Sequence, residues 1–384
     1  MENNNPFEGL PFFGDFEKLF GSGSKDHWST AKQIAVQMAS GEDGDPNVDP
    51  SDRIALEELS RIAQLHVSNA TGLDSGNAIV VPVTRTQWAH ETIDSYQPLF
   101  EKLNDSLGES SGNEIESNDP MGAMFGQMMQ FLGPMMLAMT AGSMVGHLAQ
   151  RALGQYDLPI PREKNAGVKV VTKNVEDFGG EWSLPSQELL LWVCLNELTY
   201  YTIFQLDHVR DRFGNLLMEY VSAFESNPSG LEEKLQQIDM TSPSAIEDLQ
   251  KSLGSPEVIL GAIQSEEQKY ILPELEATTA VIVGYVDFVM DSVGHGLIGS
   301  YDQITEAMRR QRVEADPSDR FIERLLGLEL TQAQVDRGTT FINGVIERTG
   351  TAELARLWED SKNFPTPNEV DAPGLWLARL DLPE

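Results

Sequence analysis

The residues best placed to do chemistry lie in one apolar stretch, 185–213, whose centre reads NELTY from Asn196 to Tyr200. This centre has the spacing of the motif H-E-x-x-H, in which two histidines one helical turn apart bind Zn²⁺ and the glutamate acts as general base. Only the glutamate, Glu197, is retained. Asn196 offers a neutral amide and Tyr200 a phenol that ionises at about pH 10, so neither is a usual zinc ligand.

The composition is that of a globular and strongly acidic protein. The chain has 384 residues, enough for a large core and two domains, and its formal net charge is −33. Such a surface repels phosphate backbones, so we expect no nucleic-acid partner. The single cysteine, Cys194, excludes an intrachain disulfide, and the N-terminus has no basic segment before an apolar run. We therefore expect a cytoplasmic protein with a buried thiol at Cys194.

Helical periodicity dominates the chain, and only two runs, 78–83 and 167–172, favour β-strands. The sequence thus predicts a mainly α fold with a few short strands. The expected organisation is a flexible tail, an N-terminal helical region, an acidic linker, Met- and Gly-rich helices and a large C-terminal domain, at 1–26, 27–103, 104–120, 121–155 and 156–384.

Residues 121–150 contain no Asp, Glu, Lys or Arg and hold eight of the 14 methionines, a length that can span a bilayer. Gly142 and Gly146 form a G-x-x-x-G spacing that also occurs in membrane dimers. Several glutamines, many glycines and Pro134 disfavour insertion. We therefore predict two close-packed helices inside the protein, broken at Gly133-Pro134, and no membrane span.

The central helix is predicted to begin near 183–187 and to end before Gly214, since Arg210 and Arg212 precede that glycine. It is apolar nearly all round, which indicates burial. Further helices are predicted downstream at 216–224, 231–238, 245–253, 258–263 and 266–293.

A set of short segments follows the central helix in a characteristic order up to the C-terminus. They are VGYVDFVMD within 266–293, the arginines Arg309, Arg310 and Arg312, LLGLEL at 325–330, then Trp358, Phe364-Pro365-Thr366, Glu369, Pro373 and Trp376. In this order, over roughly 180–380, the chain resembles a zincin-like metallopeptidase family widespread in actinobacteria. Its members are labelled zinc-dependent metalloproteases, hydrolases or proteins associated with deazaflavin-coenzyme biosynthesis.

The resemblance implies a zincin-like helical core, with the general base at Glu197 and the ligand positions at Asn196, Tyr200 and Val283. All three ligand positions have lost their usual side chains. It also implies that the strand at 167–172 is the edge strand that aligns an extended substrate. Three residues near Val283 either orient ligands or belong to an ordinary helix surface, and both interpretations stay open: Tyr285, Asp287 and Asp291.

Two functional hypotheses follow. In the first, the chain is a zincin-fold protein without catalytic zinc that binds a protein or peptide partner and needs no cofactor. In the second, it is an active zinc-dependent metallopeptidase with atypical ligands. A catalytic zinc needs three protein ligands and an open position, which favours the first. A membrane-associated protein that uses 121–150 is a third hypothesis.

Overall fold

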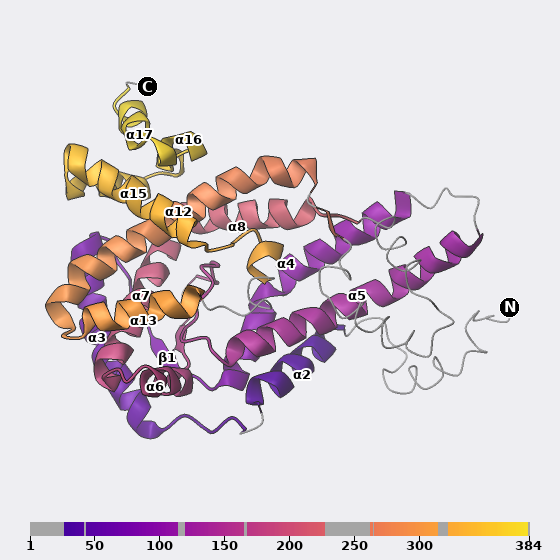
Figure 1. The fold of residues 1–384 in the computed structure, drawn as a ribbon, viewed down its shortest axis with the longest axis horizontal. Helices are drawn as coiled ribbons and strands as arrows, with labels where there is room; N and C mark the ends of the chain where they lie inside the picture. The colour runs from indigo at the N-terminus through magenta and orange to yellow at the C-terminus, as the bar shows by residue number, and fades with distance from the viewer. Residues whose placement is uncertain are drawn as a thin grey trace.

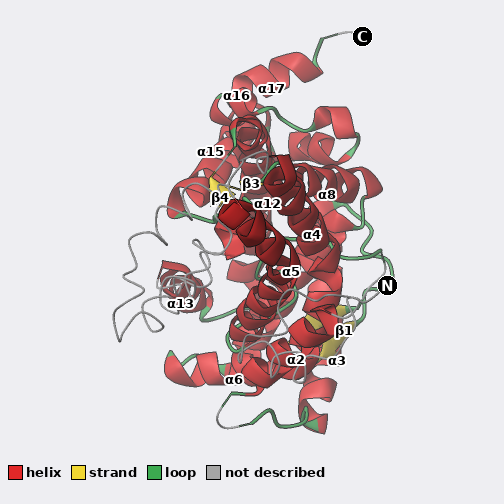
Figure 2. Ribbon diagram, turned by 90° about the vertical axis from the view of Figure 1, so that its right-hand side faces the viewer, coloured by secondary structure: helices red, strands yellow, loops and turns green. Residues whose placement is uncertain are grey.

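A computed structural model describes residues 27–41, 44–113, 120–164, 167–226, 262–263, 265–313 and 322–382. Helices build nearly all of this part, and the strands are short (Figure 2), which confirms the predicted mainly α fold. The predicted tail at 1–26 and the predicted helices at 231–238 and 245–253 lie outside the described residues.

Three N-terminal helices pack together (Figure 1): α2 (His27–Ser40), α4 (Arg85–Asn113) and α5 (Pro120–Ala149). A side chain at Gly142 would place its Cβ 2.4 Å from the carbonyl oxygen of Ala31, and one at Gly146 would lie 2.7 Å from that of Ala35. The G-x-x-x-G spacing therefore lets α5 approach α2 closely inside the protein.

Two predictions about these helices are wrong. The break at Gly133-Pro134 does not occur, because α5 is continuous and Pro134 lies inside it. An internal proline costs about 3 kcal/mol, and the packing of α5 on both α2 and α4 offsets that cost. Helix α4 also continues to Asn113, well into the predicted linker. Within this extension the buried hydroxyl of Ser106 donates to the carbonyl of Val221, 3.2 Å away, which ties α4 to the end of α8.

Helix α3 (Pro50–Thr71) begins after Asp49, which accepts from the amide of Ser51, and Pro50 lies in its first turn. Both predicted strands form: β1 (Val80–Pro82) and β2 (Val168–Val170) are a parallel pair. A second pair, β3 (Glu225–Ser226) and β4 (Ala262–Ile263), is antiparallel. A helix was expected at 258–263. The structure describes only Ala262 and Ile263 of this segment, and both lie in β4, so the prediction is wrong for these two residues.

Helix α6 (Thr172–Glu181) leads into the central helix α7 (Ser186–Phe204), which is buried on nearly all sides as predicted. Cys194 is buried within α7, and burial raises the pKa of its thiol. The central helix is shorter than expected. Leu206 has an extended backbone (ψ 113°), so a separate helix, α8 (Asp207–Ser222), starts at Asp207 and contains the predicted stop signal Gly214.

The C-terminal part is built on α12 (Glu266–Leu297), which a capping box at Ser265 and Gln268 initiates. It is long and apolar enough to cross a membrane, but 72% of its apolar window is buried inside the protein, as in a core helix. The elements that follow are α13 (Tyr301–Val313), α15 (Gln332–Thr349), η1 (Thr351–Trp358), η2 (Ser361–Asn363), α16 (Pro367–Asp371) and α17 (Pro373–Leu380).

A single hydrophobic core runs from Ala35 to Leu377 and includes side chains from α2 through α17. Within it, α12 and α15 cross at Gly284 and Gly338. A Cβ at Gly338 would lie 1.9 Å from the carbonyl oxygen of Ala280, so no side chain fits there. The contact of these two backbones fixes the C-terminal helices on the helix that faces α7.

We expect Gly338→Ala to lower the free energy of unfolding by about 2 kcal/mol, because the added methyl group must push α15 away from α12. The measurement is urea unfolding followed by circular dichroism. Gly214→Ala is the matched control. Gly214 lies inside α8, and a Cβ added there would have no atom within 4 Å apart from the backbone of its own helix. Alanine there should stabilise the protein by about 0.5–1 kcal/mol. Equal effects of the two changes would contradict the close crossing.

Candidate functional site

Glu197 is the centre of the candidate site, and the chain covers it directly. Its side chain is only 1% exposed. Its Oε2 accepts hydrogen bonds from the backbone amides of Gln155, 2.8 Å away, and Tyr156, 3.0 Å away. A Cβ at Gly154 would lie 2.2 Å from the carboxyl carbon of Glu197, so only glycine fits there. Residues 152–157, which we call the covering loop, therefore close over the carboxylate.

Other elements hold the covering loop from its remaining sides. The indole nitrogen of Trp88, on α4, donates to the carbonyl of Gly154 at 2.8 Å. The side-chain amide of Asn174, on α6, donates to the carbonyls of Ala149 and Ala152 at 2.9 and 2.7 Å. The amide of Val171 donates to the carbonyl of Leu153 at 2.9 Å. Three separate elements thus position the backbone whose amides Glu197 binds.

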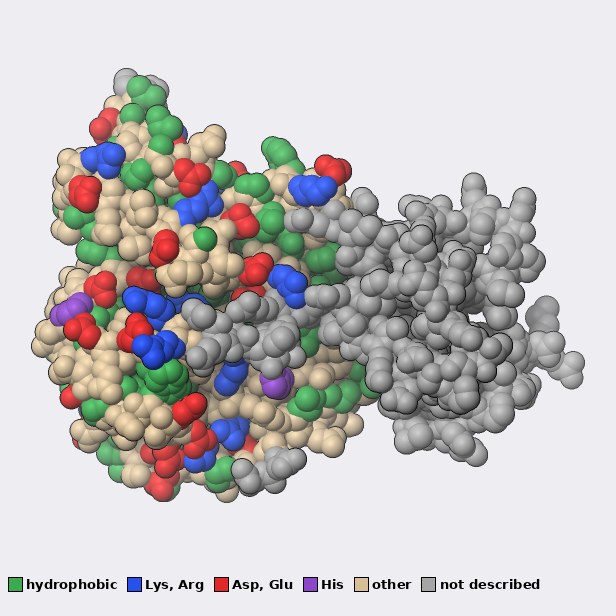
Figure 3. Space-filling model, viewed as in Figure 1, with side chains coloured by type: hydrophobic (Ala, Val, Ile, Leu, Met, Phe, Trp, Pro, Cys, Tyr) green, Lys and Arg blue, Asp and Glu red, His purple; other side chains and the backbone are tan. Residues whose placement is uncertain are grey.

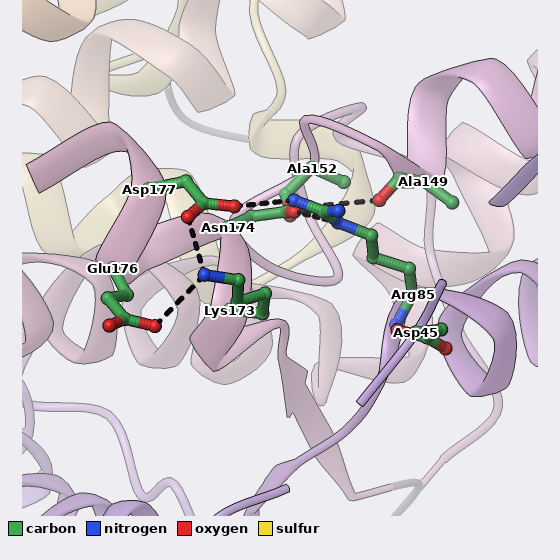
Figure 4. A network of polar contacts seen from close by, with 8 residues as sticks. All are labelled: Asp45, Arg85, Ala149, Ala152, Lys173, Asn174, Glu176 and Asp177. Carbon is green, nitrogen blue, oxygen red and sulfur yellow. Dashed lines mark hydrogen bonds and ion pairs between the residues drawn. The ribbon is translucent and has the colours of Figure 1, made fainter. Parts of the chain in front are cut away.

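Asn174 is itself oriented by a network of charged side chains (Figure 4). Arg85 donates from Nε to the side-chain oxygen of Asn174 at 2.5 Å and forms an ion pair with Asp177 at 2.7 Å. Lys173 pairs with the same Asp177 at 2.7 Å. Asp45 accepts from the backbone amides of Arg85 and Thr86, which fixes the first turn of α4. The network fixes the amide of Asn174 in the orientation that donates to both carbonyls.

The pKa of Glu197 is raised to about 8, mainly by burial and in smaller part by the nearby charge of Asp157. The amides of Tyr156 and Gln155 and the guanidinium of Arg162 act in the opposite direction. The guanidinium of Arg162 stacks over the ring of Tyr96, with 4.6 Å between the guanidinium carbon and the ring centroid. The folded protein therefore binds a proton at Glu197 more tightly than the unfolded chain does.

The predicted ligand positions carry side chains that do not fit zinc. Tyr200 is buried, and its ring stacks on Tyr156 with the centroids 5.8 Å apart. Burial raises the pKa of its phenol, whereas a metal-bound phenolate requires a lowered one. Val283 is buried in α12 and has no donor atom, and Asn196 is half-buried with a neutral amide. Helices α7 and α12 contact each other, so the positions fall on neighbouring elements. Across the described ranges, no cluster of three or more His, Cys, Asp or Glu could hold a metal ion.

The three residues near Val283 take part in packing and helix contacts. Tyr285 packs edge-on against Trp358 of η1, with the ring centroids 4.7 Å apart. Asp291 accepts from the hydroxyl of Tyr301 at 2.8 Å, which ties α12 to α13. Asp287 is half-buried, and burial raises its pKa to about 6 while Arg312 opposes the rise. These contacts give Tyr285 and Asp291 a structural part, and a ligand-orienting part for them stays a prediction.

The strand before the central helix does not have the free edge that was expected of it. On one side, β2 pairs with β1. On the other side, Val170 forms an antiparallel bridge with Gly154 of the covering loop. At the outer edge of the pair, Pro82 has no N–H to offer. The prediction that this strand aligns an extended substrate is therefore wrong, because the covering loop occupies its edge.

The arginines of α13 lie on a mixed-charge surface. Arg309 and Arg310 both form ion pairs with Glu306, at 3.3 and 2.8 Å, within the same helix. Figure 3 shows acidic and basic side chains interspersed over this face of the molecule. These two arginines therefore belong to a solvated helix surface, where such pairs contribute little to stability.

The covering loop and its supports were not identified from the sequence. Gln155 and Tyr156 lie 42 and 41 residues before Glu197, and Trp88 lies 66 residues before Gly154. The only local signal is Asp157, which accepts from the amides of Leu153 and Gly154 and so marks a tight turn. That signal predicts a turn, but it does not indicate what the turn covers.

We expect the free energy of unfolding to fall as pH rises from about 4.5 to 8, between the ordinary pKa of Glu197 and its raised value. The folded state binds this proton more tightly than the unfolded chain does, so protonation of Glu197 stabilises the fold fully below the ordinary pKa of 4.5. This stabilisation decreases as pH rises and is lost once pH passes about 8. Glu197→Gln keeps an acceptor and removes the titration, so its stability should vary less over this range. The measurement is urea unfolding at several pH values.

Asn196→Ala is the control for this experiment, because it changes a neutral, half-buried neighbour on the same helix. It should leave the pH dependence as in the unmodified protein. A Glu197→Gln variant with the full slope would show that another group causes the decline.

Comparisons with known proteins agree with this fold. A family model described as zincin-like metallopeptidase matches residues 27–377, so the match begins well before the segment that carried the sequence resemblance. The crystal structure of a protein from Chloroflexus aurantiacus, described as a "putative hydrolase with a novel fold", is similar with a TM-score of 0.64. That protein is 23% identical, and the match covers 93% of this chain and 99% of that one, a likeness that shows the fold alone. No curated protein matches the sequence. Since the family model spans nearly the whole chain, the protein belongs to the zincin-like metallopeptidase family.

Proposed function

We propose that this protein is a non-catalytic member of its family, a pseudo-metallopeptidase that acts as a binding or scaffold protein. The observation that carries the proposal is the burial of Glu197 against the amides of Gln155 and Tyr156. A general base must reach the water that it activates. Here the carboxylate faces backbone amides, and one oxygen already accepts two hydrogen bonds.

The ligand chemistry supports the same proposal. Zinc affinity comes from imidazole, thiolate or carboxylate groups. An amide, a buried phenol and a valine stand at the three family positions, Asn196, Tyr200 and Val283. A catalytic site also keeps one coordination position open for water or substrate. The covering loop fills the space next to Glu197 and occupies the strand edge at Val170.

The partner that we propose is a protein or peptide in the cytoplasm. The net charge of −33 repels nucleic acid. One cysteine, buried in α7, suits a reducing compartment. No cofactor forms part of the proposal. The alternative is an active zinc-dependent metallopeptidase with atypical ligands, for which the retained Glu197 and its raised pKa are the favourable observations.

We expect the purified protein to carry no stoichiometric zinc and to cleave no peptide. Elemental analysis of the purified protein measures its zinc content. Mass spectrometry of a peptide mixture incubated with the protein detects any cleavage. About one zinc per chain that Tyr200→Phe removes, or a peptidase activity that Glu197→Gln abolishes, would establish the alternative.

The converse experiment restores the ligands. Asn196→His, Tyr200→His and Val283→Glu together should create a site for about one zinc, since α7 and α12 contact each other. The control carries the two histidines but keeps Val283, and should bind zinc at least tenfold more weakly for want of the third ligand. Isothermal titration calorimetry measures both affinities. Equal affinities would place the third ligand position elsewhere than Val283.

A further inference from the structure

The outward side of α3 carries an unusual group of apolar side chains. Eight large hydrophobic residues are exposed in the described parts of the chain, and three of them lie on this one helix. Ile54, Ile62 and Leu65 are 62%, 43% and 59% exposed. Single exposed leucines and isoleucines are ordinary, whereas a group on one element marks a contact surface.

The three side chains share one face of the helix. With 3.6 residues per turn, they lie within an arc of about 80° and along about 16 Å of the axis. The buried residues Ala63 and Val67 point to the opposite side of the helix. We call Ile54, Ile62 and Leu65 the outer face of α3. Its supporting side is rigid, because α3 packs directly on the buried helix α7.

The charged residues on or beside this face are Glu57, Glu58 and Arg61, of which two are acidic. Glu58 projects between Ile54 and Ile62 on the same arc and is exposed. It forms no ion pair with any residue of the described ranges, whereas its neighbour Glu57 pairs with Arg61. The chain as a whole has a net charge of −33. A second copy, an anionic membrane and a nucleic acid would all be repelled by such a surface.

We propose that the outer face of α3 docks a basic amphipathic helix of a partner protein. The apolar residues of that helix would cover Ile54, Ile62 and Leu65, and one of its lysines or arginines would lie opposite Glu58. An apolar stripe with matching spacing is how one helix recognises another. This inference rests on the proposed function, because it supplies the kind of partner that a binding protein requires.

The test uses a synthetic 18-residue helical peptide with leucines at i, i+4, i+7 and i+11 and lysines on its other faces. Fluorescence anisotropy at about 0.1 M salt measures its binding to the full-length protein. The double variant Ile62→Gln and Leu65→Gln should bind about tenfold more weakly, since two apolar contacts are lost while helix propensity is kept. Glu58→Lys should weaken binding too, by several-fold.

Leu375→Gln is the matched control, because Leu375 is 56% exposed on α17, a different helix. It should bind the peptide as the unmodified protein does, which separates docking on α3 from general attraction to an acidic surface. A peptide with glutamates in place of the lysines should not bind. If circular dichroism shows that the double variant is unfolded, Ile54→Gln provides the same test alone.

Three outcomes would overturn the inference. The first is equal affinity for the double variant and the unmodified protein. The second is a dimer in sedimentation that the double variant dissolves, which would assign the face to a second copy. The third is binding to phosphatidylserine vesicles that the double variant loses. Cleavage of the peptide, detected by mass spectrometry in the same samples, would contradict the proposed function instead, so the two failures are distinguishable.

Discussion

The constraint on which the structure depends is the presence of a carboxylate, Glu197, inside a helix that is buried on nearly all sides. Burying a carboxylate that has no hydrogen-bond donor lowers the stability of a fold by roughly several kcal/mol, so the folded chain must supply donors. The donors are the amides of Gln155 and Tyr156, and they are in reach only because Gly154 has no side chain. The covering loop must be held against Glu197. Trp88 on α4 and Asn174 on α6 hold it there, and the network around Arg85 orients Asn174.

Helix contacts join the central helices at the positions that the family resemblance assigns to zinc ligands. In a zinc enzyme, ligands on two helices are joined through the ion. Here side chains pack at these places: the ring of Tyr200 lies in a cluster with those of Tyr156 and Phe204, and Val283 is buried in α12. The crossing of α12 and α15 at Gly284 and Gly338 then fixes the C-terminal helices without any ligand. Packing contacts on Tyr200, Val283 and the two glycines therefore hold these helices together.

Sequence periodicity predicted the elements that depend on local residues. Both strands of the parallel pair, the start of α12 at Glu266 and the burial of α7 are such cases. The errors come from contacts distant in sequence. Pro134 stays in a helix because α2 and α4 hold α5, and the strand edge at Val170 is closed by a loop that precedes it. Of the candidate site, the sequence located the residues on α7 and α12, while the covering loop depends on tertiary packing that no local pattern encodes.

The covering loop also explains how a glutamate can remain where its histidine partners are absent. Without a metal, replacing a ligand histidine by Asn196 or Tyr200 leaves no buried group unsatisfied. Replacing Glu197 by an apolar residue would strand two buried amides, each at a cost of about 1–3 kcal/mol. The glutamate therefore has a structural role that is independent of chemistry. At 1% exposure the carboxylate lies inside the protein, where the amides of Gln155 and Tyr156 bind it.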